Sequence, residues 1–260
     1  MRQALIFLTL LLFASYGMAQ DNISEIYQEG EYHKAKIVQE PHQGVGGGNE
    51  AYIMQVGMNN TADIHQLKAD NYSKQDQSGQ DNWTRALIYG LENHTIQVQE
   101  GTNGWQYIGQ TGIENTVYQR QLGDNENNWS KTVQRGKDNR STQIQKGDNA
   151  YANVLQEFYD NIATQNQGGN ENWADISQEG NYNKASQTQF GEYNQSTIVQ
   201  NGPNYGTNNY AYTNQRGMNN YAEITQMGDN HMAEILQVGI DASAVIYQTG
   251  MNHTANIVQR

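Results

Sequence analysis

An 11-residue unit repeats along almost the whole chain after residue 21. Its pattern is Asn-x-Ala-x-Ile-x-Gln-x-Gly followed by two further residues, and we number its positions 1 to 11. One nearly perfect copy runs from Asn220 to Gly228. Of the 21 copies, 20 have Gln at position 7, with Ile88 as the exception, and 15 have Asn at position 1. Such self-similarity predicts a repeat architecture.

The residues that recur from unit to unit at positions 1, 3, 5 and 7 follow the two-residue alternation of a β-strand. Each unit therefore predicts a strand of about seven residues. The Gly-x-x segment that follows predicts a tight turn, where glycine adopts positive φ at low cost.

A second period of 22 residues is visible at position 5 in the centre of the chain, where small or apolar residues alternate with Gln. In chain order this position reads Ile64, Gln75, Ala86, Gln97, Ile108, Gln119, Thr132, Gln143, Val154, Gln165, Ile176, Gln187 and Ile198. The structural repeat is thus strand-turn-strand, with odd and even strands in different sheets. One sheet is expected to place mainly aliphatic residues in the interior and the other to place Gln there.

These patterns predict an all-β fold, a two-sheet β-solenoid of about ten coils with cross-β stacking. Coils spaced ~4.7–4.8 Å apart would span on the order of 50 Å. Hydrophobic residues make up only 36% of the chain, so buried amides must pair with their copies in neighbouring coils. The predicted interior ladder comprises Gln66, Gln99, Gln110, Gln134, Gln145, Gln156, Gln167, Gln178, Gln189, Gln200, Gln215, Gln226, Gln237, Gln248, Asn172 and Asn220.

Extra residues interrupt the repeat at 40–48, 124–127 and 203–208, and both prolines of the chain lie in these insertions. Proline cannot donate a ladder hydrogen bond. The insertions are therefore expected to be loops.

Residues 1–19 have the features of a secretory signal peptide. Arg2 is the basic residue, Ala4 to Phe13 is a short apolar run, and small residues precede a cleavage site expected after Ala19. Residues 20–260 then form the repeat solenoid, which is expected to be exported and to have no membrane span.

Neither end of the repeat region carries a recognisable cap, so the end strands are expected to present unpaired backbone groups to a matching partner. The predicted self-assembly residues are Asn22, Ser24, Ile26 and Gln28 at one end and Ala255, Ile257 and Gln259 at the other. Head-to-tail stacking does not close, which predicts a filament.

The string from Gln215 through Gly217, Asn220 and Ala222 to Gln226 resembles the curlin repeat, Gln-x-Gly-x-x-Asn-x-Ala-x-x-x-Gln. The resemblance covers about residues 22–260. It implies a secreted subunit of curli-type amyloid fibres in the biofilm matrix, with an outer-membrane export pore and a nucleator subunit as partners. The chain has about twice the coils of a typical major subunit and lacks a clear Gly-rich export segment. Its regular last repeat favours the major, fibre-forming role.

Five aromatic residues occupy position 2 of units in one predicted sheet: Trp83, Trp105, Trp129, Tyr151 and Trp173. Position 2 points outward, so an exposed aromatic column is expected over five consecutive coils. Two interpretations remain open. The column stabilises the sheet by stacking, or it is an adhesive stripe for fibre contacts, surfaces or glycans.

Other functions find little support in the sequence. The formal net charge of −12 argues against nucleic acid as a partner. The chain has no Cys, and its six His show no metal-ligand spacing, so no metal or other cofactor is expected. No nucleophile elbow or phosphate-binding loop is present, so we do not expect an enzyme. The alternatives are a minor nucleating subunit and a monomeric β-solenoid adhesin.

Overall fold

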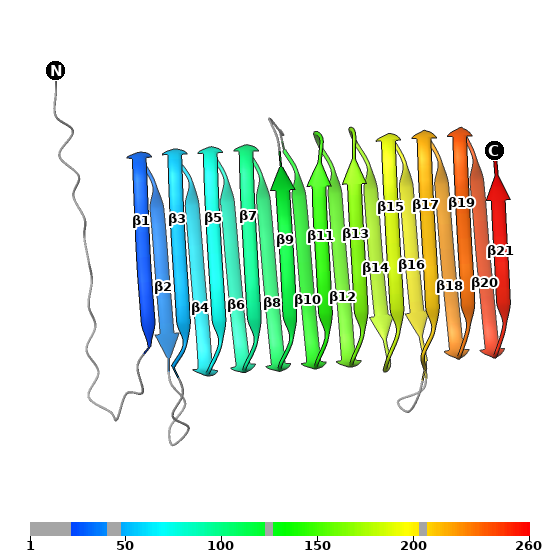
Figure 1. The fold of residues 1–260 in the computed structure, drawn as a ribbon, viewed down its shortest axis with the longest axis horizontal. Helices are drawn as coiled ribbons and strands as arrows, with labels where there is room; N and C mark the ends of the chain where they lie inside the picture. The colour runs from blue at the N-terminus through cyan, green and yellow to red at the C-terminus, as the bar shows by residue number, and fades with distance from the viewer. Residues whose placement is uncertain (1–21, 41–47, 123–126, 203–206) are drawn as a thin grey trace.

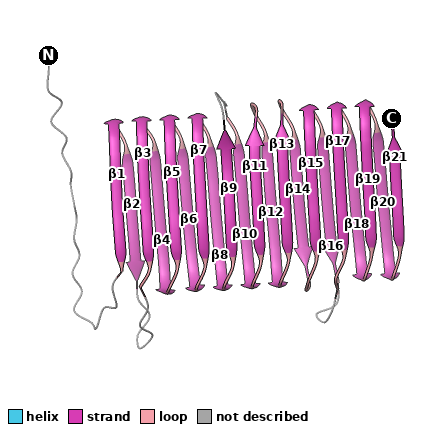
Figure 2. Ribbon diagram, viewed as in Figure 1, coloured by secondary structure: helices cyan, strands magenta, loops and turns pink. Residues whose placement is uncertain are grey.

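The computed structural model describes residues 22–40, 48–122, 127–202 and 207–260 (Figure 1). These residues form 21 strands in two sheets, with connections but no helix among them (Figure 2). The expected leader at 1–19 and most of the three expected insertions lie outside the described residues. The β-solenoid predicted from the repeat is confirmed.

Sheet A has eleven strands in the order β1-β3-β5-β7-β9-β11-β13-β15-β17-β19-β21. Their bounds are β1 Ile23–Glu31, β3 Glu50–Met58, β5 Tyr72–Gln80, β7 His94–Thr102, β9 Thr116–Leu122, β11 Arg140–Lys146, β13 Ile162–Gly168, β15 Lys184–Glu192, β17 Tyr210–Met218, β19 Met232–Ile240 and β21 Thr254–Gln259.

Sheet B has ten strands in the order β2-β4-β6-β8-β10-β12-β14-β16-β18-β20. Their bounds are β2 Lys34–Glu40, β4 Thr61–Ala69, β6 Trp83–Leu91, β8 Trp105–Ile113, β10 Trp129–Lys137, β12 Tyr151–Tyr159, β14 Trp173–Glu179, β16 Gln195–Asn201, β18 Tyr221–Asp229 and β20 Ser243–Met251.

Each strand from β1 to β19 pairs in parallel with the strand two units later, so equivalent repeat positions lie over one another. The usual offset is 22 residues, as between Thr61 and Trp83. It grows to 24 between Trp105 and Trp129 and to 26 between Lys184 and Tyr210, where residues are inserted. The insertions therefore lengthen connections without shifting the register of the sheets.

Burial alternates along each strand as the two-residue period requires. Over the first six residues of β10, half-buried and buried residues alternate, and the buried ones occupy repeat positions 3, 5 and 7, which therefore face the interior. Aliphatic residues form two clusters. One spans Val154 to Ile246, and the other spans Ala51 to Ile88.

The strands have six to nine residues, and many include the glycine that the sequence assigned to the turn. Gly79 has φ +109°, and a Cβ added to it would lie 2.0 Å from the carbonyl oxygen of Gly101 in the next coil. Glycine is thus required for both its conformation and its close approach to the neighbouring backbone.

A second residue with positive φ directly precedes position 1 in most units. Asp81 is one example, with φ 55°. The set is rich in Asn and Asp, which tolerate the left-handed region better than other side chains. The repeat pattern did not single out this position, because several residue types occupy it.

Candidate assembly surfaces

The Gln residues at position 7 of sheet A form an unbroken ladder from the first strand to the last. Each Nε2 donates to the Oε1 of the next Gln, over 2.6 to 3.1 Å. The members are Gln28, Gln55, Gln77, Gln99, Gln121, Gln145, Gln167, Gln189, Gln215, Gln237 and Gln259.

The equivalent ladder in sheet B has one break. Gln39 donates to Gln66 at 2.9 Å, and Ile88 then takes the place of a Gln. Beyond Ile88 the ladder resumes through Gln110, Gln134, Gln156, Gln178, Gln200, Gln226 and Gln248, over 2.8 to 2.9 Å. The buried Oε1 of Gln110 has no partner among the described residues, because the residue before it in the stack has no amide.

The Asn residues at position 1 bond to the turns as well as to one another. Asn172 Oδ1 accepts from the backbone N–H and the side chain of Asn194, both at 3.1 Å. Asn172 Nδ2 donates to the carbonyl of Gly191 at 2.8 Å. Asn220 Oδ1 accepts from the backbone N–H of Ala242 at 3.0 Å, and Asn220 Nδ2 donates to the carbonyl of Gly239 at 3.1 Å. These side chains therefore connect consecutive turns by hydrogen bonds.

A third ladder runs through position 5 of sheet A, in addition to the ladder residues predicted at positions 1 and 7. Its bonds are 2.7 to 3.1 Å long and join Gln75, Gln97, Gln119, Gln143, Gln165 and Gln187. The alternation of Gln with apolar residues at position 5 was the sequence signal for it. Several members also donate to a backbone carbonyl of the facing sheet, as Gln165 does to Asn153 at 2.9 Å.

The edge strands are β1 and β21 in sheet A and β2 and β20 in sheet B, since each has a neighbour on one side only in the described part of the chain. Their inward residues are less covered than the same positions elsewhere. Ile26 and Ile257 are half-buried, whereas Ile64 is fully buried.

The predicted end residues lie on these edges. Asn22 directly precedes β1, Ser24, Ile26 and Gln28 lie on β1, and Ala255, Ile257 and Gln259 lie on β21. Ser24 is exposed, and its Oγ donates to Gln39 Oε1 at 2.7 Å. The two groups of residues lie at opposite ends of the stack (Figure 1).

The five aromatic residues predicted at position 2 form one stacked column over β6, β8, β10, β12 and β14. Successive ring centroids are 5.0, 4.8, 4.3 and 3.7 Å apart along the column. Trp173 is 43% exposed, and the other four side chains are half-buried. The rings of the column thus stack on one another, and each residue remains partly exposed to solvent.

Burial near this column shifts two titratable groups. It raises the pKa of Tyr151, to which the charge of Asp175 adds. Burial also raises the pKa of the Asp175 carboxyl, and a hydrogen bond from Asn153 partly opposes that rise.

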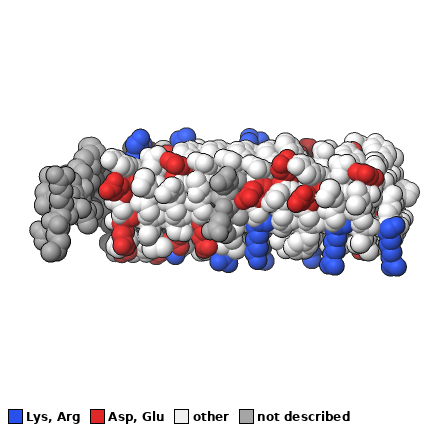
Figure 3. All heavy atoms as spheres, turned by 90° about the horizontal axis from the view of Figure 1, so that it is seen from above, with Lys and Arg blue, Asp and Glu red and all other residues white. Residues whose placement is uncertain are grey.

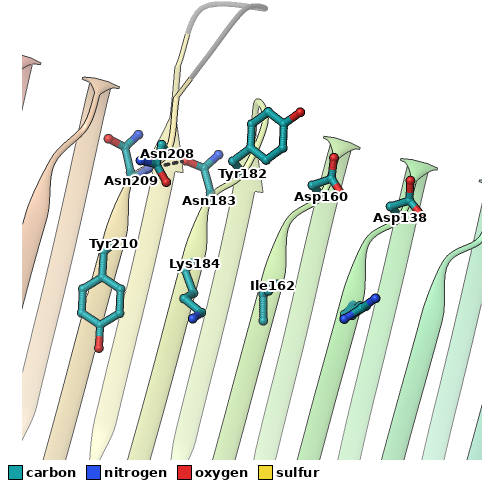
Figure 4. A pocket seen from close by; sticks show the side chains of 10 residues that line it. Asp138, Asp160, Ile162, Tyr182, Asn183, Lys184, Asn208, Asn209 and Tyr210 are labelled. Carbon is teal, nitrogen blue, oxygen red and sulfur yellow. Dashed lines mark hydrogen bonds between the residues drawn. The ribbon is translucent and has the colours of Figure 1, made fainter.

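Basic and acidic side chains are separated by uncharged surface on the face shown in Figure 3, where no continuous basic stripe forms. A hollow of about 420 Å³ lies along the turns of sheet A, where Arg140, Ile162 and Lys184 line it beside Asp138 and Asp160 (Figure 4).

Within the described ranges, no three His, Cys, Asp or Glu side chains gather as metal ligands. The same residues include no helix long and apolar enough to cross a bilayer.

Two segments of the chain match a known family. Residues 45–67 and 206–239 match the curlin associated repeat. A search of curated proteins found no match to the chain. The matched segments contain the same Gln, Gly and Asn positions that build the ladders and turns described above. These two segments therefore carry the curlin associated repeat, which supports the resemblance of the chain to the curlin family.

Proposed function

We propose that this chain is a secreted structural subunit that polymerises head to tail into curli-like extracellular amyloid fibres. The edge strands carry this proposal: at each end, parallel strands with the repeat pattern lack a neighbour on one side in the described part of the chain. Unpaired N–H and C=O rows template the addition of another strand. An identical chain supplies a matching Ile at position 5 and a matching Gln at position 7 of each edge strand.

The position-7 ladders support the same proposal. They reach the edge strands at both ends, through Gln28 and Gln39 at one and Gln248 and Gln259 at the other. All of their side-chain bonds run in one direction, with donors pointing toward the C-terminal end. In a head-to-tail stack, the amide donors at the C-terminal end of one copy would therefore face the amide acceptors at the N-terminal end of the next.

The cellular setting follows from the family and the expected leader at residues 1–19. We propose export through an outer-membrane pore, nucleation by a partner subunit at the cell surface, and a role of the fibres in biofilm matrix and adhesion. The function is structural, so we assign no reaction and no cofactor to the chain.

Charge at an end strand tests the proposal directly. Ile257→Lys places an ammonium group at a half-buried end position, where a stacked copy would bury it. We expect purified residues 20–260 to form fibres by electron microscopy with rising thioflavin T fluorescence. Ile257→Lys should slow this at least about tenfold, which corresponds to ~1.4 kcal/mol.

Ile240→Lys is the matched control, because Ile240 is 69% exposed on β19 and faces outward. It adds the same charge away from the stacking surface and should elongate like the unmodified chain. Equal elongation of both variants would contradict assembly through the end strands.

The stacked aromatic column favours adhesion as a second role of the same fibre. Its rings form a continuous row of partly exposed residues. Replacing all five residues by Ser should leave elongation intact and reduce fibre bundling or surface attachment. Unchanged bundling and attachment would reject the adhesive role and leave the stacking role.

A further inference from the structure

In the described part of the chain, the outermost strands at the two ends of the stack belong to the same sheet. Both β1 and β21 belong to sheet A, while β2 and β20 belong to sheet B. The chain alternates between the sheets, so each strand lies half a coil further along the stack than the one before it. The outermost strands at the two ends, β1 and β21, therefore lie in the same sheet.

This parity constrains how a second copy can stack. If β1 of the next copy paired with β21, its β2 would lie two strand spacings beyond β20, about 9.5 Å instead of ~4.8 Å. One strand would be missing from sheet B, and the facing N–H and C=O groups would stay unpaired. If β1 instead pairs with β20, β2 falls one spacing beyond β21 and both sheets continue without a gap.

We propose that successive copies stack with their sheets exchanged, so that β20 pairs with β1 and β21 with β2 of the next copy. This inference rests on the proposed fibre and specifies its junction. Each copy is then turned by half a revolution about the fibre axis, which also keeps the joined strands parallel. The aromatic column, confined to sheet B, would alternate between opposite faces of the fibre.

In this exchanged register the inward residues of the edge strands match, except that Ser24 faces Ala244, and the outward residues at position 6 match as well. On β21 and β2 the matching pairs are Ala255 with Ala35, Ile257 with Ile37, Val258 with Val38 and Gln259 with Gln39. On β20 and β1 they are Ile246 with Ile26, Tyr247 with Tyr27, Gln248 with Gln28 and Gly250 with Gly30. In the same-sheet register the outward residues are mismatched, with Val258 over Tyr27 and Tyr247 over Val38.

Histidines at position 1 point to the same junction. His231 and His253 stack with ring centroids 5.2 Å apart, and the backbone N–H of His253 donates to His231 Nδ1 at 3.3 Å. At the other end, His33 Nδ1 accepts from the backbone of Asn60 at 3.3 Å. The exchanged register places His33 of the next copy over His253 and continues both the stack and the hydrogen bonds. The same-sheet register would place Asn22 there.

Disulfide trapping tests the register, because the chain contains no cysteine. Val38 and Val258 lie at opposite ends of one copy but would be adjacent across the exchanged junction, ~4.8 Å apart, which a disulfide can span. Fibres would be grown from a mixture of the single variants Val38→Cys and Val258→Cys in residues 20–260, which contain all described strands. After oxidation, denaturing gels should show a covalent dimer.

Three comparisons complete the experiment. Tyr27→Cys with Tyr247→Cys should also give a dimer, whereas Tyr27→Cys with Val258→Cys, the same-sheet neighbours, should give little. Each variant polymerised alone should give no dimer. Fibres in which Tyr27→Cys and Val258→Cys cross-link instead, or in which the predicted pairs do not, would overturn the exchanged junction and leave the fibre proposal standing. An absence of fibres would overturn both.

Discussion

At position 5 of sheet A, the centre and the ends of the solenoid have different types of side chain. In the centre, six Gln form a hydrogen-bonded ladder from Gln75 to Gln187. Toward the ends the same position holds isoleucines such as Ile53 and Ile235, each within an aliphatic cluster. Both regions have the same strand arrangement. They differ in the type of side chain that each interior residue needs in the adjacent coils.

An amide ladder needs an amide in the coil before it and in the coil after it, whereas aliphatic packing needs only apolar contact. Gln75, the first member of the ladder, illustrates this requirement. It stacks on Ile53, which has no amide, so the Oε1 of Gln75 has no hydrogen-bond partner in the described structure. The position-5 ladder therefore stays inside one copy. The position-7 ladders extend to the edges, where the proposed fibre would continue them.

Adding a methyl group to a central turn is expected to have the largest effect. Gly79→Ala meets both an unfavourable φ of +109° and the carbonyl oxygen of Gly101 at 2.0 Å. Strain and overpacking together should lower the free energy of unfolding by about 3–5 kcal/mol. Urea denaturation followed by circular dichroism measures it.

Gly239→Ala provides the matched change near the end of the stack. Gly239 has φ +136°, but nothing lies within 4 Å of the added Cβ. It should cost only the conformational part, about 1–3 kcal/mol. Equal losses in the two variants would show that the contact between coils contributes nothing.

Breaking the central ladder is expected to have the next largest effect. Gln165→Leu removes the acceptor of Gln143 and the donor to Gln187. We expect a loss of about 2–4 kcal/mol, because buried amide groups are left with fewer partners. Ile257→Leu at the same repeat position of the end strand should cost less than about 1.5 kcal/mol. A Gln165→Leu protein as stable as Ile257→Leu would contradict the ladder account.

Repairing the break in sheet B should stabilise the protein. Ile88→Gln supplies an amide between Gln66 and Gln110 and gives the unpaired Oε1 of Gln110 a donor. The gain is expected to be about 1 kcal/mol, after the loss of the apolar side chain. A lower denaturation midpoint would show that aliphatic packing outweighs ladder continuity at this coil.

The smallest effect is expected on the outer surface. Burial raises the pKa of Asp175 above its ordinary value of 3.8, so its contribution to stability is present below that value and lost as pH rises through the folded pKa. Asp175→Asn should therefore stabilise the protein at neutral pH, by about 0.5 kcal/mol or less. The gain should vanish below pH 3.8, and a gain independent of pH would exclude the carboxylate charge as its cause.

The repeat predicted most of the fold, because its two periods specify strand spacing and sheet assignment independently. The alternation at positions 3, 5 and 7 placed Gln66 and Gln226 in the interior, and the common register brought Trp83 and Trp105 together. Both inferences need only the order of residues along parallel, in-register strands.

The turns could not be derived in the same way. Asn and Asp are common at the site before position 1, but Tyr182 also adopts the positive φ there, so no single residue type marks that site. The bonds from Asn172 to the backbone of neighbouring turns depend on how closely the coils approach. Gln165 donates to the facing sheet as well as to its copy, which depends on the separation of the sheets.

X-ray diffraction from aligned fibres of residues 20–260 tests the central claim most directly, because the strands must lie perpendicular to the axis along which copies are added. The account predicts a meridional reflection at ~4.7–4.8 Å and an equatorial one near ~10 Å. A β-rich chain that stays monomeric for days at tens of micromolar, with no fibres to align, would contradict it.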